Sequence, residues 1–254
     1  MAARPAPRTM TVLRFHQLTP HMLRLTLGGS NMADFPTGQK GGYVKLMLRP
    51  DGGEGKPTLR TYTIRDQRSD ELDIDFVLHI DGEGEAGPAT SWAMAAKPDD
   101  EIEVGGPGPA KPLPSGFDNY LIAGDMTALP AIAANLEDLP ADASGIAVLE
   151  IQDEADRQNL AAPANMEIRW LVNPQPGTQP EALAQALREH GWPDGRNYCW
   201  AACEFSAMRH LRSYLREEKG LGADQLYLSS YWKSGLTEEA HKIAKREDAQ
   251  AQEA

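Results

Sequence analysis

Arginine, tyrosine and threonine alternate in the segment 60–65 (RTYTIR), which has the composition of a β-strand. Successive strand residues point to opposite faces, so we expect Arg60, Tyr62 and Ile64 on one face and the residues between them on the other. An aromatic ring beside a guanidinium can stack on a planar ligand while the arginine neutralises a phosphate. The same residue types also fit an ordinary amphipathic strand, so this pattern alone leaves both interpretations open.

A second candidate lies where a strand ending near His79 runs into a glycine-rich stretch and then into the segment GPATSWA. We expect a helix to begin there, with Thr90 or Ser91 as the capping residue. Free N–H groups at the start of a helix bind phosphate well. A flexible hairpin loop followed by a capped helix would give the same pattern without any ligand.

A third candidate is the loop AGDMTALP at 123–130, which follows a short apolar strand. Thr127 and the start of the next helix could meet a phosphate, whereas an acidic Asp125 beside that phosphate would be unfavourable. A capped helix that binds nothing explains this loop equally well.

Composition and charge narrow the classes of partner. The chain has 254 residues and a net charge of −12, and 41% of its residues are apolar, as in ordinary globular proteins. An acidic chain repels phosphate backbones, so nucleic acid is a poor candidate partner. No apolar run approaches the roughly 20 residues of a membrane-spanning helix, and the N-terminus lacks a secretory signal pattern, so we expect no membrane association.

Residue types that bind metals are sparse. Cys199 and Cys203 are the only cysteines, too few for an iron–sulfur cluster or a Cys-only zinc site. The six histidines show no ligand spacing, so we expect no resident metal. The segment NYCWAAC is typical of a buried strand, which predicts two buried thiols and a reducing, cytoplasmic compartment.

The elements that must position these candidates fall into two regions. Residues 1–115 contain short strand patterns separated by glycine- and proline-rich turns, which predicts an all-β barrel or sandwich. Apolar residues alternate in LDIDFVLHI (72–80), so this strand should bury one face. Residues 116–235 alternate strand and helix patterns, which predicts a parallel sheet covered on both sides. Residues 236–254 are a polar tail, either helical or frayed.

Several motifs occur together in a characteristic order: RTYTIR, DFVLH, GPATSWA, AGDMTALPAI, ACEFSAMRHLRSYL and YWKSG. With this combination, which covers nearly all of residues 8–235, the chain resembles the siderophore-interacting protein family, flavin-dependent reductases of ferric siderophores related to ferredoxin reductases. The resemblance implies a six-stranded antiparallel FAD-binding β-barrel followed by a parallel-sheet α/β domain that binds NAD(P)H.

The resemblance also implies which residues bind FAD. Arg60 would hold the pyrophosphate, Tyr62 would pack against the isoalloxazine ring, and Thr63 would hydrogen-bond near its reactive edge. The other implied FAD positions are Thr61 in the same strand, His79, Ala89, Thr90, Ser91 and Trp92 around the glycine-rich stretch, and Tyr231 and Trp232 near the C-terminus. The flavin would supply the chemistry, so no catalytic side chain is expected.

For NAD(P)H the resemblance points to Asp125 and Thr127, in the family's loop after the first α/β strand. Only Gly124 of the fuller dinucleotide fingerprint remains there. Glu204 matches the family's acid near the nicotinamide pocket, although an acid that satisfies a helix dipole explains it as well. The choice between NADH and NADPH stays open, because acids and an arginine are both present after the second strand (DEADR, 153–157).

The implied substrate is a ferric siderophore, often anionic, which basic residues would hold. Lys45 and Lys233 match basic positions of the family. Lys111 is a third candidate, but Gly108 occupies the aligned position, so we favour a surface charge at Lys111. The implied mechanism passes hydride from the nicotinamide to the flavin and single electrons to Fe(III), which is substrate rather than a resident metal. We expect the protein to act as a monomer.

Two other functions remain open at this point. The fold could serve a flavin reductase with a different electron acceptor, such as a protein partner. Alternatively, the chain could bind ferric complexes without turnover, an idea that the sparse glycines of AGDMTALP keep open.

Overall fold

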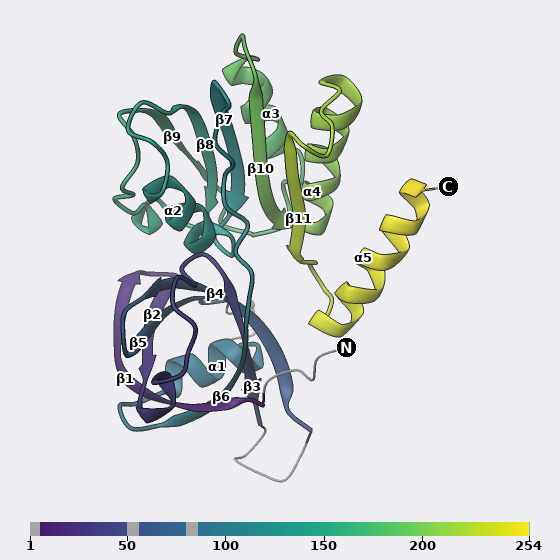
Figure 1. Cartoon of the computed structure of the whole chain (residues 1–254). Helices are drawn as coiled ribbons and strands as arrows, with labels where there is room; N and C mark the ends of the chain where they lie inside the picture. The colour runs from purple at the N-terminus through teal and green to yellow at the C-terminus, as the bar shows by residue number, and fades with distance from the viewer. Residues whose placement is uncertain (1–5, 50–55, 80–85, 254) are drawn as a thin grey trace. The chain divides into compact units, whose positions relative to one another are not determined.

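The computed structural model describes residues 6–49, 56–79 and 86–253. The chain divides into two compact units, Met1–Pro112 and Leu113–Ala254, and each is described by itself (Figure 1). Among the described residues, no helix combines the length and the apolar character that crossing a membrane requires.

The first unit is a closed barrel in which every neighbouring pair of strands is antiparallel, in the order β1-β2-β5-β4-β3-β6. Its strands are β1 (Arg8–Thr19), β2 (Met22–Gly28), β3 (Tyr43–Leu48), β4 (Thr58–Gln67), β5 (Glu71–Val77) and β6 (Glu101–Gly108). The prediction of a six-stranded antiparallel barrel is therefore confirmed.

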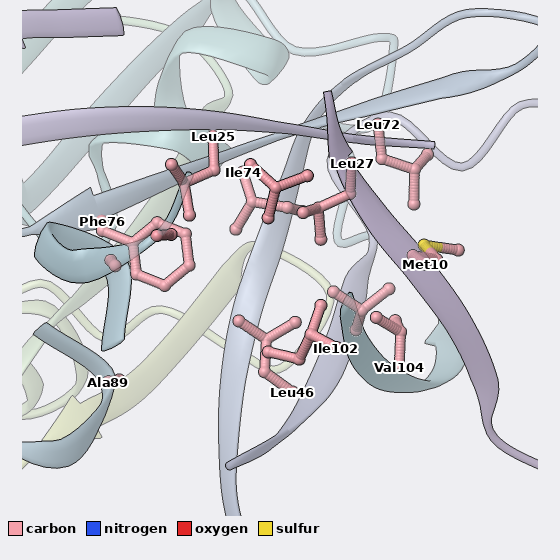
Figure 2. Packing of buried hydrophobic residues seen from close by; sticks show 14 of the residues in the cluster. Met10, Leu25, Leu27, Leu46, Leu72, Ile74, Phe76, Ala89, Ile102 and Val104 are labelled. Carbon is pink, nitrogen blue, oxygen red and sulfur yellow. The ribbon is translucent and has the colours of Figure 1, made fainter. Parts of the chain in front are cut away.

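The interior of the barrel follows from the alternation in its strands. Leu72, Ile74 and Phe76 of β5 are fully buried and meet inward-pointing residues of the other strands (Figure 2). Helix α1 (Pro88–Ala95) packs against β2, β3 and β5. Ala89 and Ala93, four residues apart on one face of this helix, are part of the same core.

The second face of β5, which carries acidic residues, is buried as well. Asp73 and Asp75 are each 6% exposed, because arginines of neighbouring segments cover them. Arg68 Nη2 lies 2.7 Å from Asp73 Oδ1, and Arg24 Nε lies 2.6 Å from Asp75 Oδ1. The expectation that this strand buries only one face was wrong, because charge pairing across strands covers the other.

The second unit is a five-stranded parallel sheet in the order β11-β10-β7-β8-β9. Its strands are β7 (Asn119–Asp125), β8 (Ser144–Ile151), β9 (Asn165–Val172), β10 (Asn197–Glu204) and β11 (Leu226–Trp232). From β7 the chain first adds strands on one side and then returns to add β10 on the other. The connection therefore changes direction between β7 and β10.

Helices cover both faces of this sheet, as predicted (Figure 1). Helices α3 (Ala182–His190) and α4 (Phe205–Arg212, continued by a π-helical stretch, Ser213–Glu218) share one apolar cluster with Leu121 and Ala123 of β7. Helix α2 (Leu129–Glu137) packs on the opposite face. A Cβ on Gly124, which points to that face, would lie 2.6 Å from Ile132 Cδ1, so the glycine lets α2 approach the strand closely.

Every residue of strand β10, which lies between β11 and β7, is buried. Cys199 and Cys203 lie on this strand, both fully buried and unpaired, and burial raises the pKa of the Cys199 thiol to about 12. The prediction of two buried thiols in a strand is confirmed.

The C-terminal tail forms helix α5 (Glu238–Glu253), which contacts β11 and α4 through polar groups. His241 Nε2 lies 2.8 Å from the buried Ser230 Oγ, and Lys245 Nζ donates to Ser230 O at 3.0 Å. Arg212 Nη2 donates to Asp248 Oδ1 at 2.9 Å. These contacts make α5 part of the α/β unit.

Candidate cofactor and substrate sites

Arg60 and Tyr62 lie on the inner face of β4, as their alternation predicts. They are opposite Leu46 and Val44 of β3, both of which are fully buried. The half-buried Tyr62 ring has its centroid 4.3 Å from that of Phe76, at an interplanar angle of 37°. The Phe76 ring is in turn 6.0 Å from that of Trp92 on α1. Two predicted FAD residues, Tyr62 and Trp92, are thus joined through Phe76, which the sequence marked only as apolar.

The start of helix α1 differs from the expectation. The helix begins at Pro88 with Gly87 as its N-cap, and no side chain caps it. The prediction that Thr90 or Ser91 is the cap was wrong, because the fixed φ of proline suits the first helical position and starts the helix three residues earlier than a Thr90 cap would. The Thr90 hydroxyl instead contacts Val77 O at 3.4 Å, and the Ser91 hydroxyl donates to Ala86 O at 3.0 Å.

Lys45 lies on the opposite face from Tyr62, beside Thr61. Lys45 Nζ donates to Thr61 Oγ1 at 3.1 Å, and the two residues are paired across β3 and β4. Thr63 shares this outer face, opposite Tyr43. The predicted ligand residues of the barrel therefore divide between two faces of one strand.

Two further sequence candidates, His79 and Lys111, lie at the margins of the barrel unit. His79 is exposed at the end of a described segment, and residues 80–85 of the adjoining glycine-rich stretch lie outside the described residues. Lys111 is exposed. At Gly108 a Cβ would lie 2.1 Å from Tyr43 Cζ, so the tyrosine ring occupies the space that a side chain at this position would need.

The barrel residues suit a cofactor that combines an aromatic ring with phosphates. Tyr62 offers a partly exposed ring, and the Arg60 guanidinium lies on the same strand face. The start of α1 carries no side-chain cap, and a Cβ placed on Gly87 would meet no atom within 4 Å. The N–H groups and the helix dipole at this N-terminus favour an anion.

In the second unit, Asp125 ends β7 and is 6% exposed. Its Oδ1 accepts hydrogen bonds from the backbone N–H of Thr127 at 2.9 Å and from the Thr127 hydroxyl at 2.5 Å. Its Oδ2 accepts from Glu204 N–H and from Trp232 Nε1, each at 2.8 Å. Asp125, Thr127 and Trp232 are thus brought together, and both the N–H and the hydroxyl of Thr127 donate to this carboxylate.

Two more carboxylates lie at the same edge of the sheet. Glu204, 4% exposed, caps helix α4 by accepting from the N–H groups of Ser206 and Ala207, so its interpretation as a helix-start acid is supported. Glu150 on β8 lies opposite Asp125 in the register of the two neighbouring strands and is 8% exposed. Its carboxylate accepts a hydrogen bond from Asn173 Nδ2 at 3.2 Å. Burial, together with the charge of Asp125, raises the pKa of Glu150 to about 7. Sequence reasoning missed Glu150, because this residue lies in an apolar strand pattern.

The C-terminal candidates lie at an irregular point of β11. Tyr231 and Trp232 are neighbours on this strand, and a β-bulge at Tyr231 interrupts the pairing with β10. Burial raises the pKa of the Tyr231 hydroxyl. Lys233 follows the strand, and its Nζ lies 4.4 Å from the centroid of the Phe205 ring.

The acids and the arginine after β8 pair with one another. The Asp153 and Asp156 side chains form a reciprocal cap around a short 3-10 helix, and Arg157 Nε lies 2.6 Å from Glu154 Oε2. Within residues 6–49, 56–79 and 86–253, no three His, Cys, Asp or Glu side chains gather as a metal site would need.

An antiparallel six-stranded barrel followed by this parallel sheet defines the two-domain fold of ferredoxin-reductase-like proteins. Ferredoxin-NADP+ reductase from Plasmodium falciparum shares it, with a TM-score of 0.66 at 13% identity over 89% of this chain and 96% of that chain. Family profiles go further: residues 117–235 match "Siderophore-interacting protein", and residues 11–56 and 51–111 match "Siderophore-interacting FAD-binding domain". The chain belongs to the siderophore-interacting protein family.

Individual relatives agree with this assignment. Ferric vibriobactin reductase ViuB from Vibrio cholerae is 34% identical over 92% of both chains. The crystal structure of the siderophore-interacting protein SipS from Aeromonas hydrophila has a TM-score of 0.82 at 33% identity, covering 96% of this chain and 98% of that one. The expected cofactor FAD and the expected class, a flavin-dependent oxidoreductase, are confirmed.

Proposed function

We propose that the chain is a ferric-siderophore reductase that moves electrons from NAD(P)H through FAD to Fe(III) and releases Fe(II) in the cytoplasm. The observation that carries this proposal is the pairing of Arg60 with Tyr62 on one face of β4, inside the matched FAD-binding domain. The relationship to ViuB, a ferric vibriobactin reductase, supports the substrate class. The two unpaired thiols of β10 fit a reducing compartment.

The barrel would bind and orient the cofactor. Tyr62 would pack against the flavin ring, and Phe76 behind it would keep the tyrosine ring in place. Arg60 and the start of α1 would neutralise the pyrophosphate. When bound, FAD supplies the redox chemistry, accepting a hydride and returning electrons singly.

The α/β unit would receive the nicotinamide donor. In open parallel sheets, ligands bind at the carboxyl ends of the strands where the connection changes direction. Here that position lies between β7 and β10, where Asp125 and Glu204 are found. Lys45 and Lys233 would attract an anionic ferric complex by charge, and neither needs to exchange a proton.

An anaerobic spectral titration tests the whole proposal. The purified protein is photoreduced, and a ferric tris-catecholate siderophore is added while the flavin band and Fe(II) are followed. We expect the band to bleach on photoreduction and to return with stoichiometric Fe(II). A bleached band that iron leaves unchanged would favour a flavin reductase with another acceptor. If the siderophore reoxidises the flavin but neither NADH nor NADPH reduces it, NAD(P)H is not the electron donor of this protein.

Tyr62 provides a test of the cofactor site. Tyr62→Ala removes the ring, so FAD should bind more weakly and its visible band should shift. Tyr62→Phe keeps the ring and is the matched control, expected to stay close to the parent protein. Circular dichroism of both variants verifies that the barrel is folded. Unchanged FAD affinity in a folded Tyr62→Ala protein would exclude the ring from the flavin site.

Lys45 and Lys233 provide a test of the substrate site. Replacing both by Glu should raise KM for an anionic ferric siderophore several-fold, because attraction becomes repulsion, while reduction of a neutral acceptor should be spared. Lys97→Glu, a change at an exposed lysine that follows α1, is the control for net charge. An equal rise in KM in the control would mean that overall charge, not these two lysines, sets the effect.

A further inference from the structure

The Asp125 carboxylate accepts hydrogen bonds from the turn after its own strand and from the ends of two other strands. It belongs to the end of β7, and it accepts from Thr127 in the following turn, from Glu204 N–H at the end of β10, and from the Trp232 indole at the end of β11. Because β10 lies between β7 and β11, the bond to Trp232 spans an intervening strand. One side chain therefore links the ends of three adjacent parallel strands.

The arrangement requires a carboxylate. Each Asp125 oxygen accepts two hydrogen bonds, four in all. An amide has one acceptor oxygen, so Asn at this position would turn its NH2 group towards one pair of donors and lose both bonds. Burial raises the pKa of Asp125, and the four hydrogen bonds oppose that shift by favouring the charged form.

Trp232 is held at two places. Its Nε1 donates to Asp125 at 2.8 Å. At the far end of the ring, a Cβ built on Gly177 would lie 3.3 Å from Trp232 Cη2, so the backbone of residue 177 lies close to the indole. Gly177 has φ +83°, a conformation that favours glycine, which keeps this approach close. The indole is thus held near both ends, and Trp232 is partly exposed.

We propose that Asp125 is a positioning residue that fixes the Trp232 indole at the carboxyl edge of the sheet, and that it binds no cofactor itself. All four hydrogen bonds of its carboxylate come from the protein, so no lone pair is left to accept a hydrogen bond from a ribose hydroxyl, and a phosphate would be repelled by the negative charge. This differs from the sequence-based expectation of a cofactor contact at Asp125. The effect on reaction rate rests on the proposed function, in which the α/β unit receives the nicotinamide donor at this edge of the sheet, but the fixing of the indole does not.

Nuclear magnetic resonance tests the structural half without any cofactor. In a 15N-labelled protein, Trp232→Phe identifies the Trp232 indole N–H signal among the five tryptophans by its loss. Asp125→Asn should shift that signal and speed its exchange with solvent. Tyr120→Phe is the matched control: it removes a hydrogen bond on the same strand, from Tyr120 Oη to Pro114 O at 2.9 Å, away from the carboxyl edge. An indole signal unmoved by Asp125→Asn would overturn the proposal.

Stopped-flow reduction of the FAD-loaded protein by NADH and by NADPH tests the functional half. If Asp125 acts through the indole, Asp125→Asn and Trp232→Phe should each slow flavin reduction by about 10- to 100-fold, the scale expected for a small misplacement. The double variant should be no slower than the slower single variant. If the rate losses of the two single variants multiply in the double variant, Asp125 does not act through Trp232. A parent protein that binds no FAD would count against the proposed function and would leave the resonance result standing.

Discussion

The barrel and the parallel sheet both bury carboxylates, and they surround them with different partners. On β5, Asp73 and Asp75 are within 2.9 Å of the guanidinium groups of Arg68 and Arg24. At the carboxyl edge of the sheet, Asp125, Glu150 and Glu204 are about as buried, and their partners are N–H and hydroxyl donors. In the described part of the chain, no lysine or arginine forms an ion pair with these three.

The difference appears in the protonation equilibria. Arg14 and Arg68 lower the pKa of Glu71 to about 2, and hydrogen bonds from Arg68 and Thr26 outweigh burial to lower the pKa of Asp73. At the sheet edge, burial raises the pKa of Asp125 and of Glu150. Ionised carboxylates therefore stabilise the barrel, whereas an ionised Glu150 costs stability in the α/β unit. Buried acids retained at a cost are typical of functional edges.

Glu150→Gln is expected to have the largest effect. The native state keeps a proton on Glu150 between pH 4.5 and about 7 that the unfolded chain has lost, so stability falls as pH rises through this window. The shift corresponds to at most about 3 kcal/mol, since each pKa unit is about 1.4 kcal/mol. Urea unfolding should show Glu150→Gln to be more stable than the parent at pH 8 and nearly equal at pH 4. Glu189→Gln, an exposed change, is the control; a similar gain there would refute the burial argument.

Arg68→Ala tests the barrel side of the comparison. It leaves the buried Asp73 without its two closest cationic contacts, so we expect a loss of about 2 kcal/mol, reduced from the value for fully buried pairs because the arginine is partly exposed. Arg49→Ala removes a surface pair with Glu103 and should cost less than about 1 kcal/mol. Thermal unfolding of both variants compares them, and equal losses would place the Arg68 network among ordinary surface pairs.

Acidification should change the stabilities of the two units in opposite directions, and we expect this effect to be smaller than those of the substitutions. The ionised Glu71 stabilises the barrel, because its pKa is lower in the folded state than in the unfolded chain. This stabilisation is lost progressively as the pH falls from 4.5 towards 2 and Glu71 becomes protonated. Between pH 7 and 4.5 the α/β unit instead gains stability as Glu150 is protonated. Hydrogen exchange, corrected for intrinsic rates, should show barrel amides opening before those of β7, β8 and β10 as the pH falls. The reverse order would contradict the contrast between the units.

Local sequence patterns predicted those features of the fold that depend only on residues close together in the chain. Alternation placed Arg60 and Tyr62 on one face of a strand, and apolar runs located the buried thiols of β10. The start of α1 was missed because proline at the first helical position outweighed the usual capping residues.

Other features depend on residues far apart in the chain. Asp75 is paired with an arginine 51 positions away, and Asp125 with a tryptophan 107 positions away. Periodicity describes one strand at a time, so it gives no partner for a charge that faces another strand. The second buried face of β5 and the role of Asp125 at the sheet edge therefore required the structure.

The two cysteines have a practical consequence for spectroscopy. Both are fully buried in β10, and burial keeps their thiols protonated at neutral pH. Only thiolates react readily with maleimides or spin labels. A cysteine introduced on an exposed surface, for example at Ser69 or Asp142, should therefore be labelled selectively without first removing the native pair. With one such label in each unit, the distance between the two labels could be followed during turnover.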